Sequence, residues 1–206
     1  MKLQVALDYM DLDRSLAVAA AVAPHTDWLE AGTSLVKLAG MTAVAALRTR
    51  FPDHTVVADM KTADGGRKET EMAFAAGADV STVLGLVPDK CIVECLEAAG
   101  SVGRTVFVDL LGCNPVRWAE LHRLGVTHVI YHIGKDQQGQ MALKAETIWQ
   151  LKEPFGFTVA VAGGVMLEQM GDLRRAGPDV VIVGSAITGA SDPGAAARAF
   201  RVAMEG

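Results

Sequence analysis

The chain contains few cysteines, no long apolar run and no cluster of basic residues. Its three cysteines are too few and too poorly spaced for a disulfide framework, and no nearby histidine completes a zinc pattern. We therefore expect Cys91, Cys95 and Cys113 to be free thiols. No apolar run reaches membrane-spanning length and the first residues do not resemble a secretion signal, which predicts a cytoplasmic protein without a membrane partner.

Positive charge is also scarce. Lys and Arg together number 19 against 24 Asp and Glu, which gives a formal net charge of -5 and disfavours a nucleic-acid partner. No Ser- or Pro-rich linker or low-complexity segment divides the sequence, so we expect one domain over residues 1–206. Half of the residues are hydrophobic, which is typical of a globular domain with a large core.

Short apolar runs alternate with amphipathic stretches along the whole chain. We expect strands at residues 3–8, 28–30, 55–59, 80–83, 105–109, 128–132, 158–161 and 180–183. We expect helices at residues 12–23, 35–49, 67–76, 89–99, 115–124, 141–151, 167–176 and 193–204. Nearly continuous apolar strands are typical of parallel sheets covered by helices.

Eight strand–helix units predict an α/β fold of the (β/α)8 TIM-barrel type, and an open doubly wound sheet is the alternative. In a barrel of this type the chemistry lies at the carboxyl ends of the strands, and phosphate-binding loops commonly follow strands 7 and 8. The sequence can therefore be tested for functional residues at one rim.

Polar residues do occupy the expected carboxyl ends of the strands. They are Asp8, Glu30, Asp59, Lys61, Asp109 and His132. Strands 7 and 8 run into Gly163-Gly164 and Gly184-Ser185. The aspartates could instead cap helices and the glycines could form plain turns. Because all these residues converge on one rim, while the other rim offers mainly small residues and glycine, we expect a functional site.

Residues 59–66, DMKTADGG, are the most informative stretch. Two carboxylates and an ammonium leave the end of a buried strand together, and a glycine pair follows them. Charges seldom gather in such a place unless they form ion pairs, bind a metal or take part in chemistry. A salt bridge beside a glycine turn is the simpler alternative.

Several segments resemble a known enzyme family. They are KLQVALD at 2–8, EAGT at 30–33, ADMKTADGG at 58–66, AAGAD at 75–79, VAGGV at 161–165 and PDVVIVGSAIT at 178–188. These segments are similar to the family of 3-hexulose-6-phosphate synthase and 3-keto-L-gulonate-6-phosphate decarboxylase, within the orotidine-5'-phosphate decarboxylase group. The Asp-x-Lys-x-x-Asp motif at 59–64 marks the group, and the resemblance extends over essentially the whole chain.

The resemblance implies a homodimeric barrel that binds a magnesium ion and a phosphorylated keto-sugar. By position, Glu30 and Asp59 would ligate the metal and Lys61 would lie beside the sugar oxygens. Asp64 would reach into the active site of the partner subunit. Asp8 and the remaining rim residues would complete the catalytic group.

The chemistry of these residue types suits such a site. Magnesium prefers oxygen ligands and usually takes one or two carboxylates together with water and substrate. A metal ion beside a lysine ammonium stabilises the negative charge of an enediolate, which is the difficult species in both family reactions. The resemblance also implies that Gly163, Gly164, Gly184 and Ser185 hold the phosphate, and backbone N–H groups suit that role.

Two reactions remain open from the sequence. The synthase adds formaldehyde to ribulose 5-phosphate, whereas the decarboxylase releases carbon dioxide and then protonates the enediolate. Ser185 favours the synthase, because the decarboxylase more often carries an arginine there. Residues 131–137, YHIGKDQ, depart from both patterns: Ile133 replaces a polar residue, and Lys135 keeps the charge of a decarboxylase arginine without its planar fork.

We therefore predict a carbon–carbon lyase, most consistent with an aldehyde-lyase, with a carboxy-lyase as the alternative. In this prediction Asp109 belongs to the catalytic group, His132 handles a proton at the enediolate, and Lys135 adds positive charge nearby. A Schiff base on Lys61 is another possible mechanism, although acids beside a lysine favour the charged ammonium. Two alternatives assume that the protein is not an enzyme. The first is an inactive barrel that binds phosphorylated ligands or a partner, and the second is a generic interaction module.

Overall fold

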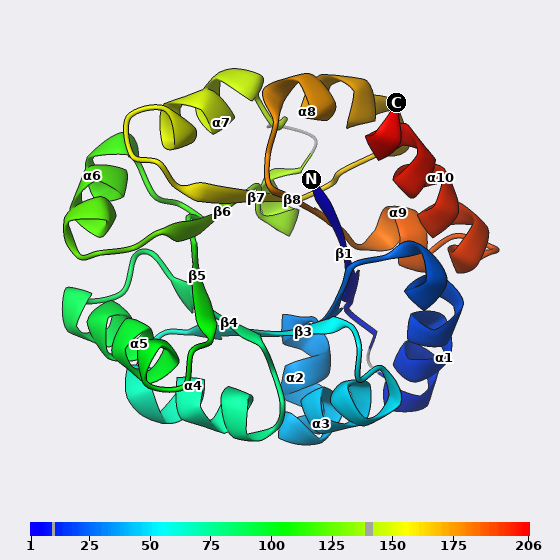
Figure 1. Cartoon of the computed structure of the whole chain (residues 1–206), viewed down its shortest axis with the longest axis horizontal. Helices are drawn as coiled ribbons and strands as arrows, with labels where there is room; N and C mark the ends of the chain where they lie inside the picture. Colours follow the sequence, from blue (N-terminus) through cyan, green and yellow to red (C-terminus); the bar gives the residue numbers. More distant parts are fainter. Residues whose placement is uncertain (10, 139–141) are drawn as a thin grey trace.

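The apolar runs of the sequence form eight parallel strands that close into a barrel (Figure 1). The computed structural model describes residues 1–9, 11–138 and 142–206. The strands are β1 (Lys2–Leu7), β2 (Trp28–Ala31), β3 (Thr55–Thr62), β4 (Val80–Leu84), β5 (Thr105–Asp109), β6 (His128–His132), β7 (Thr158–Ala162) and β8 (Val180–Val183). Each strand pairs with the next, and β8 pairs with β1, so the predicted TIM barrel is confirmed and an open sheet is excluded.

Helices surround the barrel as an outer ring (Figure 1). They are α1 (Leu12–Val22), α2 (Thr33–Ala39), α3 (Met41–Arg50), α4 (Gly66–Ala75), α5 (Asp89–Ser101), α6 (Pro115–Arg123), α7 (Ala145–Lys152), α8 (Met170–Ala176), α9 (Ser185–Thr188) and α10 (Pro193–Glu205). Short 3₁₀ helices occur at η1 (Ala23–His25), η2 (Lys135–Gln137) and η3 (Leu167–Gln169).

Several predicted boundaries were wrong. The expected helix at residues 35–49 is broken at Gly40, whose φ of +59° interrupts helical geometry between α2 and α3. The expected strand at 55–59 continues to Thr62, whereas β1 ends before Asp8. The expected helix at 167–176 begins as η3, and the one at 141–151 begins at Ala145, with residue 141 outside the described residues. The four-residue α9 was not predicted.

Alternation of side chains along the strands divides the core in two. Residues such as Leu7, Leu29 and Val56 face outward and pack with the helices in one cluster. A second cluster fills the inside of the barrel and consists of Ala6, Val57, Val80, Phe107, Ile130, Ala160, Ala162, Val180 and Ile182. Because this filling is apolar and dense, polar groups on the same strand faces gather toward the carboxyl ends.

The amino-terminal rim carries more charge than the sequence analysis expected. Each of three aspartates precedes one strand and accepts a hydrogen bond from a backbone N–H at the start of the neighbouring strand: Asp27 from Leu3, Asp79 from Val56 and Asp179 from Val159. A basic side chain from the helical ring pairs with each carboxylate, namely Arg201, Arg48 and Lys152 respectively. The three carboxylates are thus bonded to backbone N–H groups of the strands and to basic side chains, which indicates a structural role.

A cavity of about 460 Å³ opens at this same amino-terminal rim. Trp28, Phe107 and His128 contribute aromatic rings to its lining, and the charged residues around it include the paired Asp79 and Asp179. It does not include any of the predicted catalytic, metal or phosphate residues. The opposite rim differs, because three carboxylates, Glu30, Asp59 and Asp109, are buried there.

The cysteine prediction is confirmed. Cys91 and Cys95 are buried in α5, Cys113 is half-buried after β5, and all three are free thiols. None of the helices in the described ranges combines the length and hydrophobicity that crossing a bilayer requires.

Candidate active site

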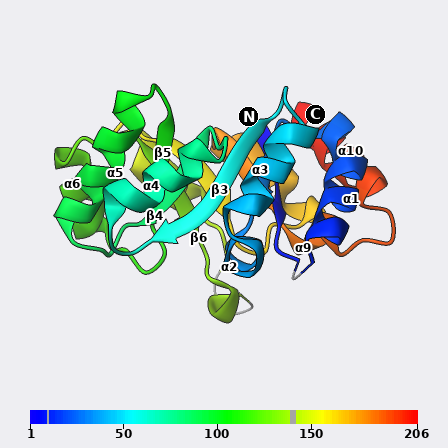
Figure 2. The ribbon, with the colours of Figure 1, turned by 90° about the horizontal axis from the view of Figure 1, so that it is seen from below.

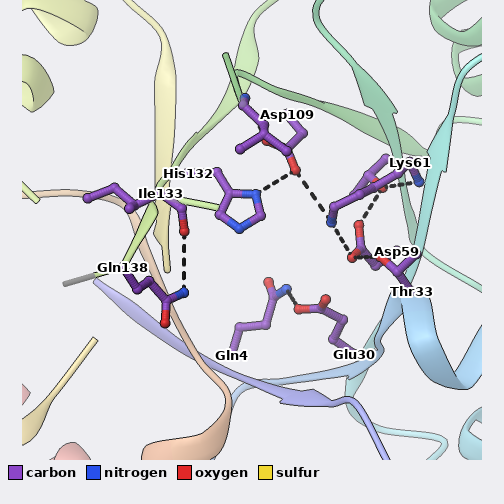
Figure 3. Close-up of polar contacts among 11 residues, drawn as sticks. Gln4, Glu30, Thr33, Asp59, Lys61, Asp109, His132, Ile133 and Gln138 are labelled. Carbon is purple, nitrogen blue, oxygen red and sulfur yellow. Dashed lines mark hydrogen bonds and ion pairs between the residues drawn. The ribbon is translucent and has the colours of Figure 1, made fainter. Parts of the chain in front are cut away.

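The carboxyl ends of the strands bring together five of the predicted residues. Glu30, Asp59, Lys61, Asp109 and His132 come from β2, β3, β5 and β6 and point toward the middle of the barrel mouth (Figure 3). Figure 2 shows β3 running across the molecule to this edge, away from both chain termini. The predicted convergence of these side chains is therefore present in the structure.

Asp59 is buried and lies at the centre of a hydrogen-bond network. Its Oδ2 accepts from Thr33 Oγ1 at 2.5 Å and from Lys61 Nζ at 2.5 Å, and its Oδ1 accepts from Thr82 Oγ1 at 2.7 Å. A carboxylate offers about four acceptor positions. Three are used here, so the carboxylate is fixed in orientation and keeps capacity for one further ligand.

Lys61 lies between two carboxylates. Its Nζ is 2.5 Å from Asp59 Oδ2 and 3.4 Å from Asp109 Oδ2. Burial alone would lower the pKa of this ammonium, but the charges of Asp59 and Asp109 and the hydrogen bond to Asp59 raise it above its ordinary value. Lys61 therefore remains a cation at neutral pH. This state suits charge stabilisation and disfavours attack on a carbonyl as a neutral amine.

Asp109 and His132 form the second part of the cluster. His132 Nδ1 lies 2.8 Å from Asp109 Oδ2, and the Leu111 N–H donates to Asp109 Oδ1 at 2.9 Å. Burial would raise the pKa of Asp109, but the hydrogen bond and charge of His132, together with Lys61, hold it below its usual value. Because an ionised Asp109 can only accept a hydrogen bond, Nδ1 of His132 carries the proton of this contact. The other ring nitrogen, Nε2, faces the middle of the mouth (Figure 3).

Glu30 is the most perturbed carboxyl of the site. It is buried, and Gln4 Nε2 donates to its Oε2 at 2.5 Å. Burial, followed by the negative charges of Asp59 and Asp8, raises the pKa of Glu30 to about 8. The negative charge of Glu30 is therefore unfavourable in this position unless a proton or a cation at the carboxyl group balances it.

This shift makes a testable difference to stability. In metal-free protein, folded Glu30 keeps its proton up to pH about 8, whereas the unfolded side chain loses it near its ordinary value of 4.5. The folded state thus binds more protons between these values, so the contribution of Glu30 to the free energy of unfolding decreases as pH rises from about 4.5 to about 8. Glu30→Gln removes this titration. We expect its Tm, measured in excess chelator, to rise relative to the parent across that window. A constant difference in Tm would contradict the assignment.

Asp8 and Lys135 lie at the edge of the same mouth. Asp8 directly follows β1 and is exposed. Partial loss of hydration and the charge of Asp59 raise its pKa, while Lys61, the backbone N–H of Ser34 and Lys135 act in the opposite direction. Lys135 begins η2 and is exposed, so it borders the site without entering it. A Cβ added at Gly32 would lie 2.3 Å from Asp8 Oδ1 and 3.0 Å from the Leu7 carbonyl oxygen, so a larger residue there would displace the Asp8 side chain.

Asp64 does not join this cluster. It is exposed beyond β3, and its Oδ1 accepts from the Gly65 N–H at 2.8 Å. Gly65 takes a φ of +63° and turns the chain into α4 at Gly66. The exposed side chain is therefore accessible to another molecule.

The glycine loops after β7 and β8 are shaped by their backbones. Gly163 and Gly164 have φ of +103° and +70°, and a Cβ at Gly163 would lie 2.0 Å from the carbonyl oxygen of Ile133. Ile133 is itself buried, which explains why an apolar residue follows His132. After Gly184, Ser185 begins α9, whose first N–H groups lack partners within the helix. The residues predicted to bind phosphate therefore lie in the turns that directly follow β7 and β8.

The donor set fits magnesium. The described residues contain no group of three or more His, Cys, Asp or Glu side chains arranged to hold a metal by themselves. Magnesium does not require such a group, because it commonly uses one or two carboxylates with water and substrate oxygens. Glu30 and Asp59 each retain an available oxygen position, so the predicted ligand pair satisfies this requirement.

The sequence analysis missed Gln4, Thr33 and Thr82, which hold the charged residues in place. Gln4 and Thr82 are polar residues inside otherwise apolar strands, and that was the available signal. Tyr9 was also missed: its hydroxyl donates to the carbonyl of Thr188 and ties the segment after β1 to α9.

Comparison with known proteins identifies similar chains over the full length. The family model described as "Orotidine 5'-phosphate decarboxylase / HUMPS family" matches residues 1–200. The 3-hexulose-6-phosphate synthase of Mycobacterium gastri is 38% identical, with 99% of this chain and 100% of that protein covered. The 3-hexulose-6-phosphate synthase structure from Salmonella typhimurium is 36% identical with a TM-score of 0.95, covering 100% of this chain and 99% of that one. The structure of 3-keto-L-gulonate-6-phosphate decarboxylase from Vibrio cholerae is 31% identical with a TM-score of 0.89, covering 99% and 97%.

Proposed function

The chain belongs to the orotidine 5'-phosphate decarboxylase / HUMPS family, and on this basis we propose that it adds formaldehyde to ribulose 5-phosphate as a magnesium-dependent aldehyde-lyase. The observation that carries the proposal is the buried cluster in which Lys61 lies between Asp59 and Asp109, beside Glu30 and His132. The similar proteins named 3-hexulose-6-phosphate synthase support the same reaction class, a carbon–carbon lyase.

In the proposed reaction a proton leaves C1 of ribulose 5-phosphate and an enediolate forms. His132 is suited to take this proton, because its Nε2 faces the mouth while Asp109 holds Nδ1. The Lys61 ammonium stabilises the charge that develops on the two sugar oxygens. C1 then forms a bond to the carbon of formaldehyde, and the former carbonyl oxygen of formaldehyde receives the proton. A magnesium ion bound to Glu30 and Asp59 would supply Lewis-acid stabilisation of the same oxygens.

The phosphate group binds away from the reacting carbons in this proposal. The backbone N–H groups around Gly163, Gly164, Gly184 and Ser185 are the proposed donors, at the loops where such barrels commonly hold phosphate. Binding energy gained there orients C1 and C2 toward Lys61 and His132. The glycine loops suit a phosphate group, and the charged cluster suits a keto-sugar. A phosphorylated keto-sugar is thus the proposed substrate class.

Decarboxylation of 3-keto-L-gulonate 6-phosphate is the second candidate. It is favoured by Lys135, whose positive charge at the edge of the mouth partly opposes the rise in the pKa of Asp8. If this activity dominates, Lys135→Ala should reduce it more than aldol addition, and Lys135→Arg should raise it, because the arginine fork is regained. These variants serve to distinguish the two reactions.

Dependence on a divalent cation tests the metal part of the proposal. We expect excess chelator to abolish the condensation of ribulose 5-phosphate with formaldehyde and added magnesium to restore it, because a magnesium ion held by Glu30 and Asp59 would supply Lewis-acid stabilisation of the enediolate. Formation of the six-carbon product is the measurement. Full turnover in chelator, together with borohydride trapping of substrate on Lys61, would instead establish a Schiff-base mechanism.

We also propose a homodimer in which Asp64 completes the site of the other subunit. Lys61→Ala and Asp64→Ala should each be inactive alone. Mixed subunits should regain part of the activity, since a heterodimer would contain one site with both residues intact. Activity of verified heterodimers, isolated with two affinity tags, is the measurement, and their complete inactivity would exclude a shared site.

A further inference from the structure

The pairing of β3 with β4 is irregular at the active site. Val57 pairs with Val80 and Ala58 with Ser81, but the next recorded pair joins Thr62 to Val83. Three residues of β3, at 59–61, therefore stand opposite the single residue Thr82 of β4. This insertion is a β-bulge, a feature that re-aims side chains beside active sites. Both the proposed metal ligand Asp59 and the cation Lys61 lie within it.

The backbone of Lys61 is strained at this bulge. Its φ is +43°, and among the described residues no other non-glycine residue has a positive φ. A residue with a side chain is strained in this region and stays there only where the surrounding structure holds it. Some contact must therefore hold Lys61 in a conformation that its own sequence does not favour.

Thr82 supplies that contact. Its side chain is 2% exposed, and its Oγ1 accepts the Lys61 N–H at 2.9 Å while donating to Asp59 Oδ1 at 2.7 Å. One hydroxyl thus satisfies both ends of the bulge. Thr33 also donates to Asp59, but its hydrogen bond reaches the other carboxyl oxygen and leaves the Lys61 backbone untouched.

We propose that Thr82 is a positioning residue that fixes the β3 bulge and thereby sets the relative placement of Asp59 and Lys61. This inference rests on the proposed function of the same site. It extends that function by assigning a role to a side chain that acts through two others. The hydroxyl of Thr82 positions the two residues because it donates one hydrogen bond and accepts another. The methyl group contributes only packing.

Two substitutions separate the hydroxyl from the methyl group. Thr82→Val keeps the shape and removes the hydroxyl, so it leaves the Lys61 N–H and Asp59 Oδ1 unpaired. Thr82→Ser keeps the hydroxyl and removes the methyl group. Ser81→Ala is the matched control, because Ser81 is the preceding buried hydroxyl of β4 and its Oγ has no hydrogen-bond partner among the described residues.

The experiment compares three readouts for these variants in folded protein. We expect Thr82→Val to lower kcat/KM for the condensation by roughly 10²-fold, the effect of a misplacement of about 1 Å in an active site. We expect its affinity for Mn²⁺, measured by electron paramagnetic resonance without substrate, to fall by about 10–100-fold. Thr82→Ser should restore both to within about threefold of the parent, and Ser81→Ala should match the parent, since neither removes a contact to the bulge. A crystal structure of Thr82→Val should show Lys61 outside the positive-φ region.

The readouts distinguish failure of this inference from failure of the proposed function. A parent protein that does not condense the two substrates overturns the proposed reaction, while Mn²⁺ affinity still tests Thr82. A parent protein that binds no Mn²⁺ overturns the proposed metal site. The crystal structure of Thr82→Val then decides whether Thr82 fixes the bulge. The inference is overturned if Thr82→Val retains the parent's metal affinity and bulge geometry, or if Thr82→Ser is impaired as severely as Thr82→Val.

Discussion

Replacing Lys61 with methionine is expected to lower kcat for the condensation by about 10²–10³-fold, the loss that follows removal of one group that stabilises developing negative charge. Methionine keeps much of the length and apolar stem but removes the ammonium held between Asp59 and Asp109. The enediolate would then lose the fixed positive charge beside its oxygens. Steady-state kinetics at saturating magnesium are the measurement, with circular dichroism to confirm folding.

Lys2→Met provides a matched control for this substitution. Lys2 lies at the start of β1 on the opposite rim, where its exposed ammonium is 3.3 Å from Asp27 Oδ1. A surface ion pair of this kind contributes little to stability, so we expect unchanged kcat. If Lys61→Met also retained the parental kcat in folded protein, Lys61 would have no part in charge stabilisation.

The second large effect concerns His132. His132→Ala is expected to lower kcat by about 10²–10⁴-fold, the usual contribution of a positioned acid or base. The imidazole is held by Asp109 at 2.8 Å with its other nitrogen toward the mouth (Figure 3). The exchange of the C1 proton of ribulose 5-phosphate with deuterium from solvent, without formaldehyde, measures this step directly.

His128→Ala is the control on the same strand. His128 lies at the other end of β6, where its ring packs against Phe107 with a centroid separation of 5.0 Å. Its removal should lower Tm while leaving proton exchange at the parental rate. Normal proton exchange in His132→Ala would contradict the acid–base role and leave Lys61 and the metal to carry the chemistry.

The barrel and the location of its functional rim could be predicted from the sequence because both depend on local patterns. Apolar runs of strand length separated by amphipathic segments define parallel strands and covering helices. In such a fold, polar residues at strand ends must meet at one mouth. Glu30, Asp59, Asp109 and His132 followed this rule, and the structure brings them together.

The remaining features depend on contacts between distant segments. The positive φ of Lys61 arises from pairing with β4, and the roles of Thr82 and Gln4 depend on partners more than 20 residues away. The charged amino-terminal rim was missed for the same reason, because the basic partners of Asp27 and Asp79 come from helices remote in sequence. A break such as Gly40 within one apparent helical pattern could not be distinguished from a tolerated glycine.

The most direct test of the proposed synthase activity is a side-by-side assay of the purified protein on two substrates. One reaction contains ribulose 5-phosphate and formaldehyde with magnesium, and the other contains 3-keto-L-gulonate 6-phosphate under the same conditions. We expect kcat/KM for the condensation to exceed that for the decarboxylation, with kcat of Lys61→Met lowered by about 10²–10³-fold in both reactions. A greater kcat/KM on 3-keto-L-gulonate 6-phosphate would contradict the proposal and identify the protein as a decarboxylase, and absence of both activities would leave a barrel that binds phosphorylated ligands without this chemistry.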